Sequence, residues 1–392
     1  MVKRIGILTG GGDCPGLNSV IYGIMLKAFD EGMECVGIEK GWKGFMENKT
    51  IPLNISEHDD LHTEGGTFLY TSRTNPFKAL RTIGDEEEKE RLRKEISTEM
   101  ASKFEDLGIY ALIAIGGDDT LGVAETMHQY TGANVIGCPK TIDNDLKGTD
   151  YTFGFWSAVQ LASNSMDNLT TTARSHQRIF VVEIMGRDAG FLTVYSGISS
   201  GSDIILIPET PFDFEKHIVE VLRRRVIGGH KYHIIACSEG AYPSKESLER
   251  DFQTISKETI EKLPKDAFGN PILPTLNMSQ ILVNEIKLRD DLRKIFEENN
   301  TNFECRSVVL GHTMRAGTPN AFDRILGLRL GLAAMKLVIN NDFGNMVALK
   351  GNDIKTVPLK DGVGKKYVEK DSDIIELRNL MVKTRYKSRE ID

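Results

Sequence analysis

One arrangement recurs along most of this 392-residue chain: an apolar run leads into a polar loop, and a helical stretch follows. The clearest case is the apolar run 110–115, the loop 116–120 (GGDDT) and the helical pattern 121–130. Strands that alternate with helices predict parallel sheets covered by helices on both faces. We therefore predict an α/β fold that binds ligands at the carboxyl ends of its strands. Other strands are expected at 2–9, 34–39, 134–138, 179–184, 203–207, 232–238 and 305–310.

Length and composition narrow the class of protein. A chain of 392 residues suggests two domains, or one large domain with insertions. A net charge of −7, with both signs interspersed, argues against nucleic-acid binding. The five cysteines are odd in number and lack metal-like spacing, which indicates a reduced, cytoplasmic protein. Because no apolar run reaches membrane-spanning length and the N-terminus is unlike a signal peptide, we expect no membrane association.

The loop 116–120 is a candidate phosphate site. Its glycines allow the backbone to approach a phosphate, and the N-terminus of the following helix attracts an anion. Asp118 and Asp119 would repel a phosphate directly, but one carboxylate can hold a divalent cation that bridges phosphate oxygens. The alternative is a structural turn in which Asp118 or Asp119 only caps the helix.

Other loops also carry candidate chemistry. Residues 10–16 (GGGDCPG) precede a helix but lack the Gly-x-Gly-x-x-Gly spacing of dinucleotide-binding proteins, which disfavours a dehydrogenase. Residues 65–78 combine glycines, hydroxyls and cations, as an anion-binding segment or a solvated loop would. In 139–145 (PKTIDND), Asp143 and Asp145 would point to the same side of an extended stretch. An Asx turn is the alternative there.

Together these motifs resemble the bacterial-type phosphofructokinase family. The matching segments follow the family's order: 10–18, 65–73, 116–120, 139–145, 175–187, 239–240 and 310–324. The resemblance implies two similar Rossmann-like domains with mostly parallel sheets flanked by helices. The phosphoryl-donor domain would hold residues 1–153 plus about 314–365, and the sugar-phosphate domain 154–313 plus about 366–392. Residues 242–277, which look like an insertion, and the tail after Lys360 lie outside the match.

The resemblance also implies an activity, which is the reversible, Mg²⁺-dependent transfer of a phosphoryl group to the 1-hydroxyl of fructose 6-phosphate, in glycolysis or gluconeogenesis. Asp118 would bind the metal, Asp143 would be the general base, and Arg187 would lie near the developing charge. The expected donor-binding residues are Gly12, Gly117 and Arg73. The expected substrate-binding residues are Thr141, Ile142, Asp143, Asp145, Met185, Gly186, Arg187, Glu239, His312, Thr313, Met314 and Arg315. In the family, the positions of Arg178 and Arg306 serve the neighbouring subunit, which implies a homodimer or homotetramer.

Asp119 and Lys140 bear on the identity of the donor, since the ATP-using members have glycine at the first position and usually at the second. A carboxylate at 119 would stand where the α-phosphate of ATP must lie. Two unit charges about 4 Å apart, at an effective dielectric near 20, repel by roughly 4 kcal/mol, or about a thousandfold in affinity. Pyrophosphate has no third phosphate to be repelled, and Lys140 adds a cation beside the transferred group. We therefore predict a pyrophosphate-dependent member.

Three alternatives remain. An ATP-dependent 6-phosphofructokinase is the nearest, because some ATP-using relatives also have lysine at position 140. A noncatalytic subunit that binds sugar phosphates or nucleotides would be expected to lack Asp118 or Asp143, and both are present. A dehydrogenase is already disfavoured by the glycine spacing.

Overall fold

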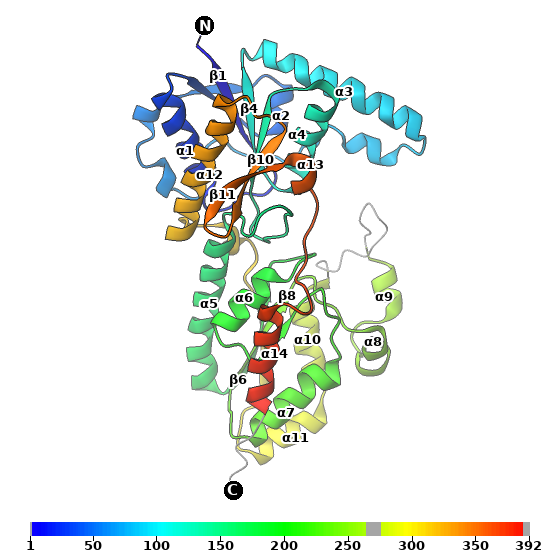
Figure 1. The fold of residues 1–392 in the computed structure, drawn as a ribbon. Coiled ribbons are helices and arrows are strands. Elements are labelled where there is room, and N and C mark those ends of the chain that lie inside the picture. The colour runs from blue at the N-terminus through cyan, green and yellow to red at the C-terminus, as the bar shows by residue number, and fades with distance from the viewer. Residues whose placement is uncertain (1, 264–275, 387–392) are drawn as a thin grey trace. The chain divides into compact units, whose positions relative to one another are not determined.

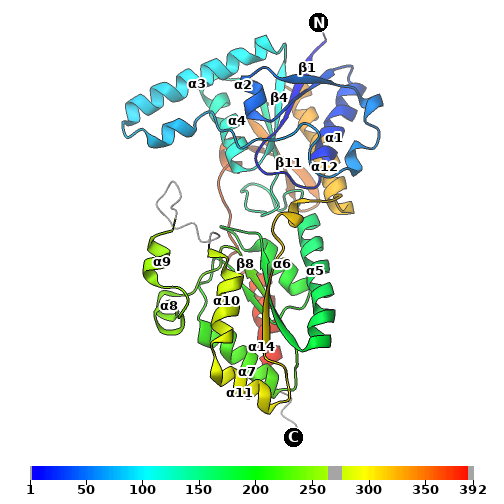
Figure 2. The ribbon, with the colours of Figure 1, turned by 180° about the vertical axis from the view of Figure 1, so that it is seen from behind.

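The computed structural model describes residues 2–263 and 276–386. These residues form two compact units, each built on its own sheet (Figures 1 and 2). Unit 1 contains the residues up to Ser157 and Arg315–Lys366, and unit 2 contains Ala158–Met314 and the residues from Tyr367 onward. The predicted α/β class is confirmed.

Unit 1 has a seven-stranded sheet in the order β11-β10-β5-β4-β1-β2-β3. The inner strands are parallel, whereas β3 and β11 pair antiparallel at the two edges. The strands are β1 Arg4–Thr9, β2 Glu34–Ile38, β3 Thr50–Leu53, β4 Ala111–Gly116, β5 Val135–Pro139, β10 Asn345–Lys350 and β11 Asp353–Pro358. The helices are α1 Leu17–Asp30, α2 Trp42–Met46, α3 Glu86–Asp106, α4 Asp118–Thr131, α12 Ala321–Ile339 and α13 Leu359–Gly362.

The inner strands of unit 1 are continuous apolar runs because helices cover both faces of the sheet. Every residue of β4 is buried, as is all of β1 after Arg4. The helices α1 and α12 pack against each other, and Figure 1 shows α3 and α4 on the other side of the sheet. The core on the α3 and α4 side includes Trp42, Phe45 and Met127.

Unit 2 has a four-stranded, fully parallel sheet in the order β7-β8-β6-β9. The strands are β6 Arg178–Ile184, β7 Ile204–Leu206, β8 His233–Ser238 and β9 Glu304–Val309. The helices are α5 Phe155–His176, whose first residues belong to unit 1, and α6 Phe191–Ser199, α7 Glu220–Ile227, α8 Lys245–Asp251, α9 Lys257–Glu261, α10 Met278–Lys287, α11 Asp290–Glu298 and α14 Asp373–Tyr386. The main core of the unit includes Leu222 of α7, Leu282 of α10 and Phe296 of α11.

Several elements differ from the sequence expectation. The edge strand β3 and the hairpin β10–β11 were not predicted, and the tail after Lys360 includes α14. The stretch 278–298 forms two helices separated at Arg289, whose backbone is extended and whose guanidinium pairs with Asp291 and Glu215. Of the expected insertion 242–277, the structure describes α8 and α9, while residues 264–275 lie outside the described residues.

The structure also bears on two expectations from the sequence, the state of the cysteines and the presence of membrane-spanning helices. All five cysteines lie within the described residues, and they are buried free thiols. Over 2–263 and 276–386, no helix has both the length and the apolar character needed to cross a membrane.

Candidate active site

Three polar loops of unit 1 lie together because their strands are neighbours. β4 lies between β1 and β5, so the loops that follow these strands leave the same edge of the sheet. Backbone hydrogen bonds continue from the strands into the loops. The Gly10 N–H donates to the Ile115 carbonyl at 2.9 Å, and the Lys140 N–H donates to the Gly116 carbonyl at 2.9 Å. Residues 10–12, 116–120 and 139–145 therefore line one edge.

A Cβ at some of the glycines in these loops would collide with a neighbouring side chain. A Cβ on Gly116 would lie 2.3 Å from the Thr120 side chain, and a Cβ on Gly12 would lie 1.9 Å from Nη1 of Arg315. The guanidinium of Arg315 therefore lies directly on the 10–12 loop of unit 1. Its Nε is buried and has no hydrogen-bond partner among the described residues. Arg315, predicted to bind the substrate with His312, thus has its guanidinium against Gly12.

Asp118 begins helix α4, and Gly117 is the N-cap residue. The interpretation of Asp118 or Asp119 as the N-cap is therefore wrong. The Asp118 carboxylate instead accepts a hydrogen bond of 2.6 Å from the N–H of Gly364, a residue 246 positions later in the chain. Asp118 is thus held at the helix N-terminus, where the helix dipole favours a negative charge.

Asp119 points away from the core. Its side chain is 75% exposed and forms an ion pair with Arg81, with the Nη2–Oδ1 distance at 3.0 Å. Water and a neighbouring cation both weaken the field of a carboxylate. Any repulsion between Asp119 and ATP would therefore be much smaller than the value expected at an effective dielectric near 20.

Lys140 is buried, with only 5% of its surface exposed. Its ammonium donates a hydrogen bond to the carbonyl oxygen of Gly12. Burial lowers the pKa of Lys140 below its ordinary value, and the nearby Arg315 acts in the same direction. Two cations that cannot be solvated fully stand beside the glycine loop, and an anion bound there would relieve this cost.

The segment 141–145 is not extended, so the expectation that Asp143 and Asp145 share one side of a strand is wrong. Asn144 adopts a left-handed conformation with φ of 52°. Its side-chain oxygen accepts a hydrogen bond of 3.1 Å from the Thr152 N–H. The Asp143 N–H donates to Oγ1 of Thr141 at 3.1 Å. These contacts describe a tight turn, the alternative that the Asn and Asp content had left open.

Asp118 and Asp145 could hold a divalent metal together. Burial raises the pKa of the Asp145 carboxyl, Lys365 opposes that shift, and Asp118 adds to it. Two carboxylates near enough to repel each other fit a Mg²⁺ ion, which proteins bind through one or two carboxylates plus substrate phosphates. Across the part of the chain that the structure describes, no group of three or more His, Cys, Asp or Glu side chains could enclose a metal by itself.

Unit 2 places a second set of predicted residues at the carboxyl edge of its own sheet. β6 lies between β8 and β9, so the segments that follow these strands are adjacent. The N–H of Met185 donates to Sδ of the buried Met314 at 3.4 Å, and the N–H of Gly186 donates to Oε1 of Glu239 at 3.4 Å. Gly186 has φ of 133°, a conformation that favours glycine.

The remaining predicted residues of unit 2 lie around this cluster. Arg187 follows Gly186 directly, and its guanidinium pairs with Asp188 at 2.9 Å. The Thr313 hydroxyl donates to the Leu310 carbonyl, and His312 beside it is exposed. In unit 1, Arg73 is also exposed, whereas Ile142 is buried.

Arg178 and Arg306 lie apart from the cluster that follows β6, β8 and β9. Both pair with Glu304, and Arg178 is the first residue of β6, while Met185 follows its last. Seven strand residues at about 3.3 Å each separate the two ends by roughly 20 Å. Neither arginine lies at the edge of the sheet that carries Gly186 and Glu239.

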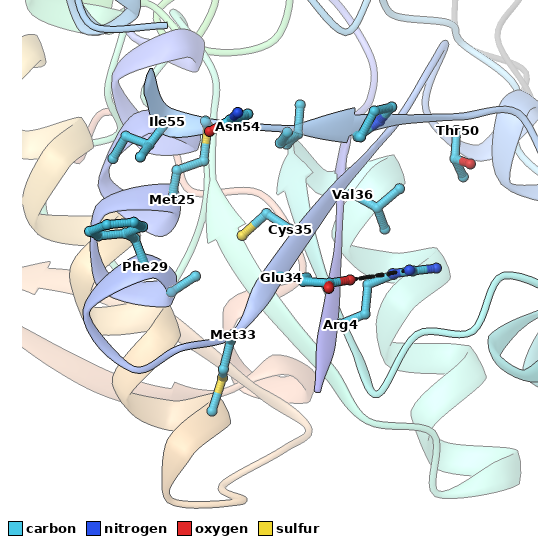
Figure 3. A pocket seen from close by; sticks show the side chains of 13 residues that line it. Arg4, Met25, Phe29, Met33, Glu34, Cys35, Val36, Thr50, Asn54 and Ile55 are labelled. Atoms are coloured by element: carbon cyan, nitrogen blue, oxygen red, sulfur yellow. Dashed lines mark hydrogen bonds and ion pairs between the residues drawn. The ribbon is translucent and has the colours of Figure 1, made fainter. Parts of the chain in front are cut away.

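A cavity of about 370 Å³ in unit 1 lies away from all these loops (Figure 3). Arg4 and Glu34, which form an ion pair on its wall, are the first residues of β1 and β2. The cavity therefore opens at the amino ends of the strands, with Phe29 and Met33 on its wall. It is no part of the site built by the glycine loops.

These features define an α/β protein with glycine loops, a buried lysine and acidic side chains at the carboxyl edge of a sheet. The chain belongs to the phosphofructokinase family, whose model matches residues 4–338. It is 43% identical over 361 residues to a pyrophosphate–fructose 6-phosphate 1-phosphotransferase of Amycolatopsis methanolica, with 91% of this chain and 94% of the relative covered. It is 39% identical over 377 residues to an ATP-dependent 6-phosphofructokinase of Spirochaeta thermophila, with 95% of each covered.

A solved structure has a similar fold. The pyrophosphate-dependent phosphofructokinase from Marinobacter aquaeolei matches with a TM-score of 0.71 at 19% identity, over 98% of this chain and 92% of that one. At this identity the match shows the fold alone. The predicted phosphofructokinase-like architecture is confirmed.

Sequence reasoning missed four residues of unit 1 that contact the predicted site. Arg81 pairs with Asp119, and Gly364 donates to Asp118. Lys365 follows Gly364, and Lys366 donates from its backbone to the Asp145 carbonyl at 2.8 Å. No local signal marks the last three, because they lie more than two hundred positions beyond the loops they contact.

Proposed function

We propose that this chain transfers a phosphoryl group reversibly between pyrophosphate and the 1-hydroxyl of fructose 6-phosphate, yielding fructose 1,6-bisphosphate and phosphate. The observation that carries the proposal is the pair of charged residues beside the Gly116–Gly117 turn. Asp119 stands in the first turn of α4, and Lys140 is buried against the Gly12 carbonyl. The Amycolatopsis methanolica relative supports the same donor through its name and its 43% identity.

On the donor side, Gly12 and Gly117 would let the backbone approach the phosphates, and the exposed Arg73 would contribute a cation to donor binding. Lys140 and Arg315 place fixed positive charge beside the 10–12 loop, where the transferred group gains negative charge in the transition state. Because its guanidinium lies on Gly12, we assign Arg315 to the donor and leave the sugar phosphate to His312, Thr313 and Arg187.

Asp118 and Asp145 would hold Mg²⁺, which when bound neutralises charge on the phosphate oxygens. Asp143 accepts the proton of the sugar hydroxyl as the general base. The turn at Asn144 holds Asp143 beside Asp145, since the Asn144 side chain accepts from Thr152 and so fixes the loop. Thr141 and Ile142 complete this segment.

On the sugar side, Met185, Gly186 and Met314 form the backbone and packing surface, and Glu239 would accept hydrogen bonds from sugar hydroxyls. Arg178 lies about 20 Å along the sheet from that cluster, and Arg306, which pairs with Phe180, lies roughly 16 Å from it, so neither is beside it. Their distance supports a homodimer or homotetramer in which these arginines serve the site of the neighbouring subunit.

An ATP-dependent reaction is a second candidate. It is supported by the Spirochaeta thermophila relative at 39% identity and by the ion pair with Arg81, which weakens the charge on Asp119.

The two donors are separated by assaying the purified protein with fructose 6-phosphate, Mg²⁺ and either pyrophosphate or ATP alone. Fructose 1,6-bisphosphate is followed through a coupled aldolase reaction. We expect pyrophosphate to support turnover, and we expect Asp143→Asn to lower kcat by about 10²- to 10⁴-fold. Equal kcat/KM with ATP would refute the donor assignment, and no turnover with either donor would refute the phosphotransferase function.

A further inference from the structure

The segment 363–366, which follows α13, pairs with the loop that carries the proposed general base. The Lys366 N–H donates to the Asp145 carbonyl at 2.8 Å, and the Lys147 N–H donates to the Gly364 carbonyl at 3.1 Å. Leu146 and Lys365 form an isolated antiparallel bridge between these two bonds. The backbone of the segment is therefore held in register beside Asp145.

The same segment reaches the proposed metal ligand of α4. The Gly364 N–H donates to the Asp118 carboxylate at 2.6 Å. Gly364 has φ of 115°, which a residue with a Cβ rarely adopts, so this contact depends on glycine. One short segment thus touches both Asp118 and the Asp145 loop.

The two lysines that follow Gly364 have different surroundings. The Lys366 ammonium donates to the carbonyls of Thr149 and Asp150 at 2.9 Å each, so it stabilises the 144–150 loop. Lys365 lies between Gly364, which donates to the Asp118 carboxylate, and Lys366, whose N–H donates to the Asp145 carbonyl. Its own backbone bridges Leu146, the residue after Asp145, so this lysine stands on the short segment that joins the two acidic residues.

We propose that Gly364 and Lys365 complete the pyrophosphate site of unit 1, with Gly364 positioning Asp118 and Lys365 binding an oxygen of the phosphoryl donor. This inference rests on the proposed function. A magnesium pyrophosphate complex remains anionic, so its oxygens that do not bind the metal need cationic partners. Lys140 and Arg315 supply such partners from the 10–12 side, and Lys365 supplies one from the Asp145 side.

The test compares Lys365→Gln with the wild-type protein and with Lys360→Gln, an exposed lysine of α13 five residues earlier. Binding of magnesium imidodiphosphate, a pyrophosphate analogue with a P–N–P bridge, is measured by calorimetry. Loss of one charge-assisted hydrogen bond predicts a rise of about tenfold or more in its Kd. The KM for pyrophosphate should rise similarly and the KM for fructose 6-phosphate should not change. Lys360→Gln should behave as wild type, and Lys365→Arg should recover most of the binding.

The outcomes separate the two levels of the proposal. A wild-type protein that uses pyrophosphate, together with a Lys365→Gln variant that binds imidodiphosphate equally well, overturns the assignment of Lys365 alone. A rise in the KM for fructose 6-phosphate alone also overturns it. A wild-type protein that neither binds imidodiphosphate nor turns over pyrophosphate overturns the proposed function, and the assignment with it. If Lys365→Gln fails to fold, Lys365→Arg decides, since retained binding supports the charge and lost binding refutes it.

Discussion

Replacing Asp119 with Asn removes its charge and preserves its size, which separates electrostatic from steric exclusion of ATP. Replacing it with Gly removes both. The carboxylate is 75% exposed and pairs with Arg81 at 3.0 Å, so we expect the charge to contribute only part of the donor preference. The part of the donor preference that is due to charge should be lost completely in Asp119→Asn.

The size of the effect follows from how strongly water screens the carboxylate. Two charges about 4 Å apart repel by roughly 4 kcal/mol at an effective dielectric of 20, but by about 1 kcal/mol in bulk water. Because most of the Asp119 side chain faces solvent, the lower figure applies, and 1 kcal/mol is about a fivefold change in affinity. We expect Asp119→Asn to raise kcat/KM for ATP about fivefold and to leave pyrophosphate use nearly unchanged.

The assay measures kcat/KM for each donor at low and high ionic strength, because screening by salt should abolish the gain with ATP. The variant Arg81→Gln should change kcat/KM for ATP in the opposite direction. Without its cationic partner Asp119 repels ATP more strongly, so ATP use should fall several-fold below wild type. When Asp119 is already replaced by Asn, adding Arg81→Gln should not change kcat/KM for ATP any further. A thousandfold gain in Asp119→Asn would refute the screening argument, and a gain seen only in Asp119→Gly would show that exclusion is steric.

Two further predictions concern unit 1. A Cβ on Gly12 would lie 1.9 Å from Nη1 of Arg315, so Gly12→Ala must displace the guanidinium. We expect Gly12→Ala to lower kcat/KM for pyrophosphate by on the order of a hundredfold. The control Gly84→Ala should match wild type, because a Cβ there meets no atom within 4 Å. Equal activity of both variants would contradict the proposed role of Arg315. Burial raises the pKa of Asp323 from 3.8 to about 6, and its carboxylate accepts bonds from the Ser157 N–H and hydroxyl. Between these two pKa values the folded state binds the proton more tightly than the unfolded state, so this group lowers stability as pH rises from about 4 to 6, by about 3 kcal/mol at most. Asp323→Asn should remove that decline, which thermal melting across this pH range would detect, and parallel profiles for variant and wild type would count against it.

Much of the fold was predictable because it depends on local patterns. The buried strands β1, β4, β5, β6 and β8 are mainly apolar, although β6 contains the buried Glu183. Glycine or aspartate follows β1 and β4 where they end. Strands of this kind, alternating with helices, leave parallel sheets as the consistent arrangement. The edge strands β3 and β11 were missed because their burial is partial and their apolar signal is weak. The inner strand β10 was missed although Met346–Leu349 is a buried apolar run.

The donor loops were predictable for the same local reason. Residues 10–12, 116–120 and 139–145 each follow a strand, and neighbouring parallel strands end at one edge. The backbone conformation within a loop was harder to predict from the sequence. Asn144 adopts a left-handed turn because its side chain accepts from Thr152, and nothing in the pattern of alternating carboxylates distinguishes that turn from a strand.

By itself, the sequence determined the α/β class, most of the buried strands and the loops predicted to carry the chemistry, because apolar periodicity and glycine placement act over a few neighbouring residues. Only the tertiary structure decided which side chains those loops meet. Gly364 reaches Asp118, Arg81 pairs with Asp119, and Arg315 lies on Gly12. Such contacts join residues 38 to more than 200 positions apart, and they form only when the packed sheet brings distant segments to one edge.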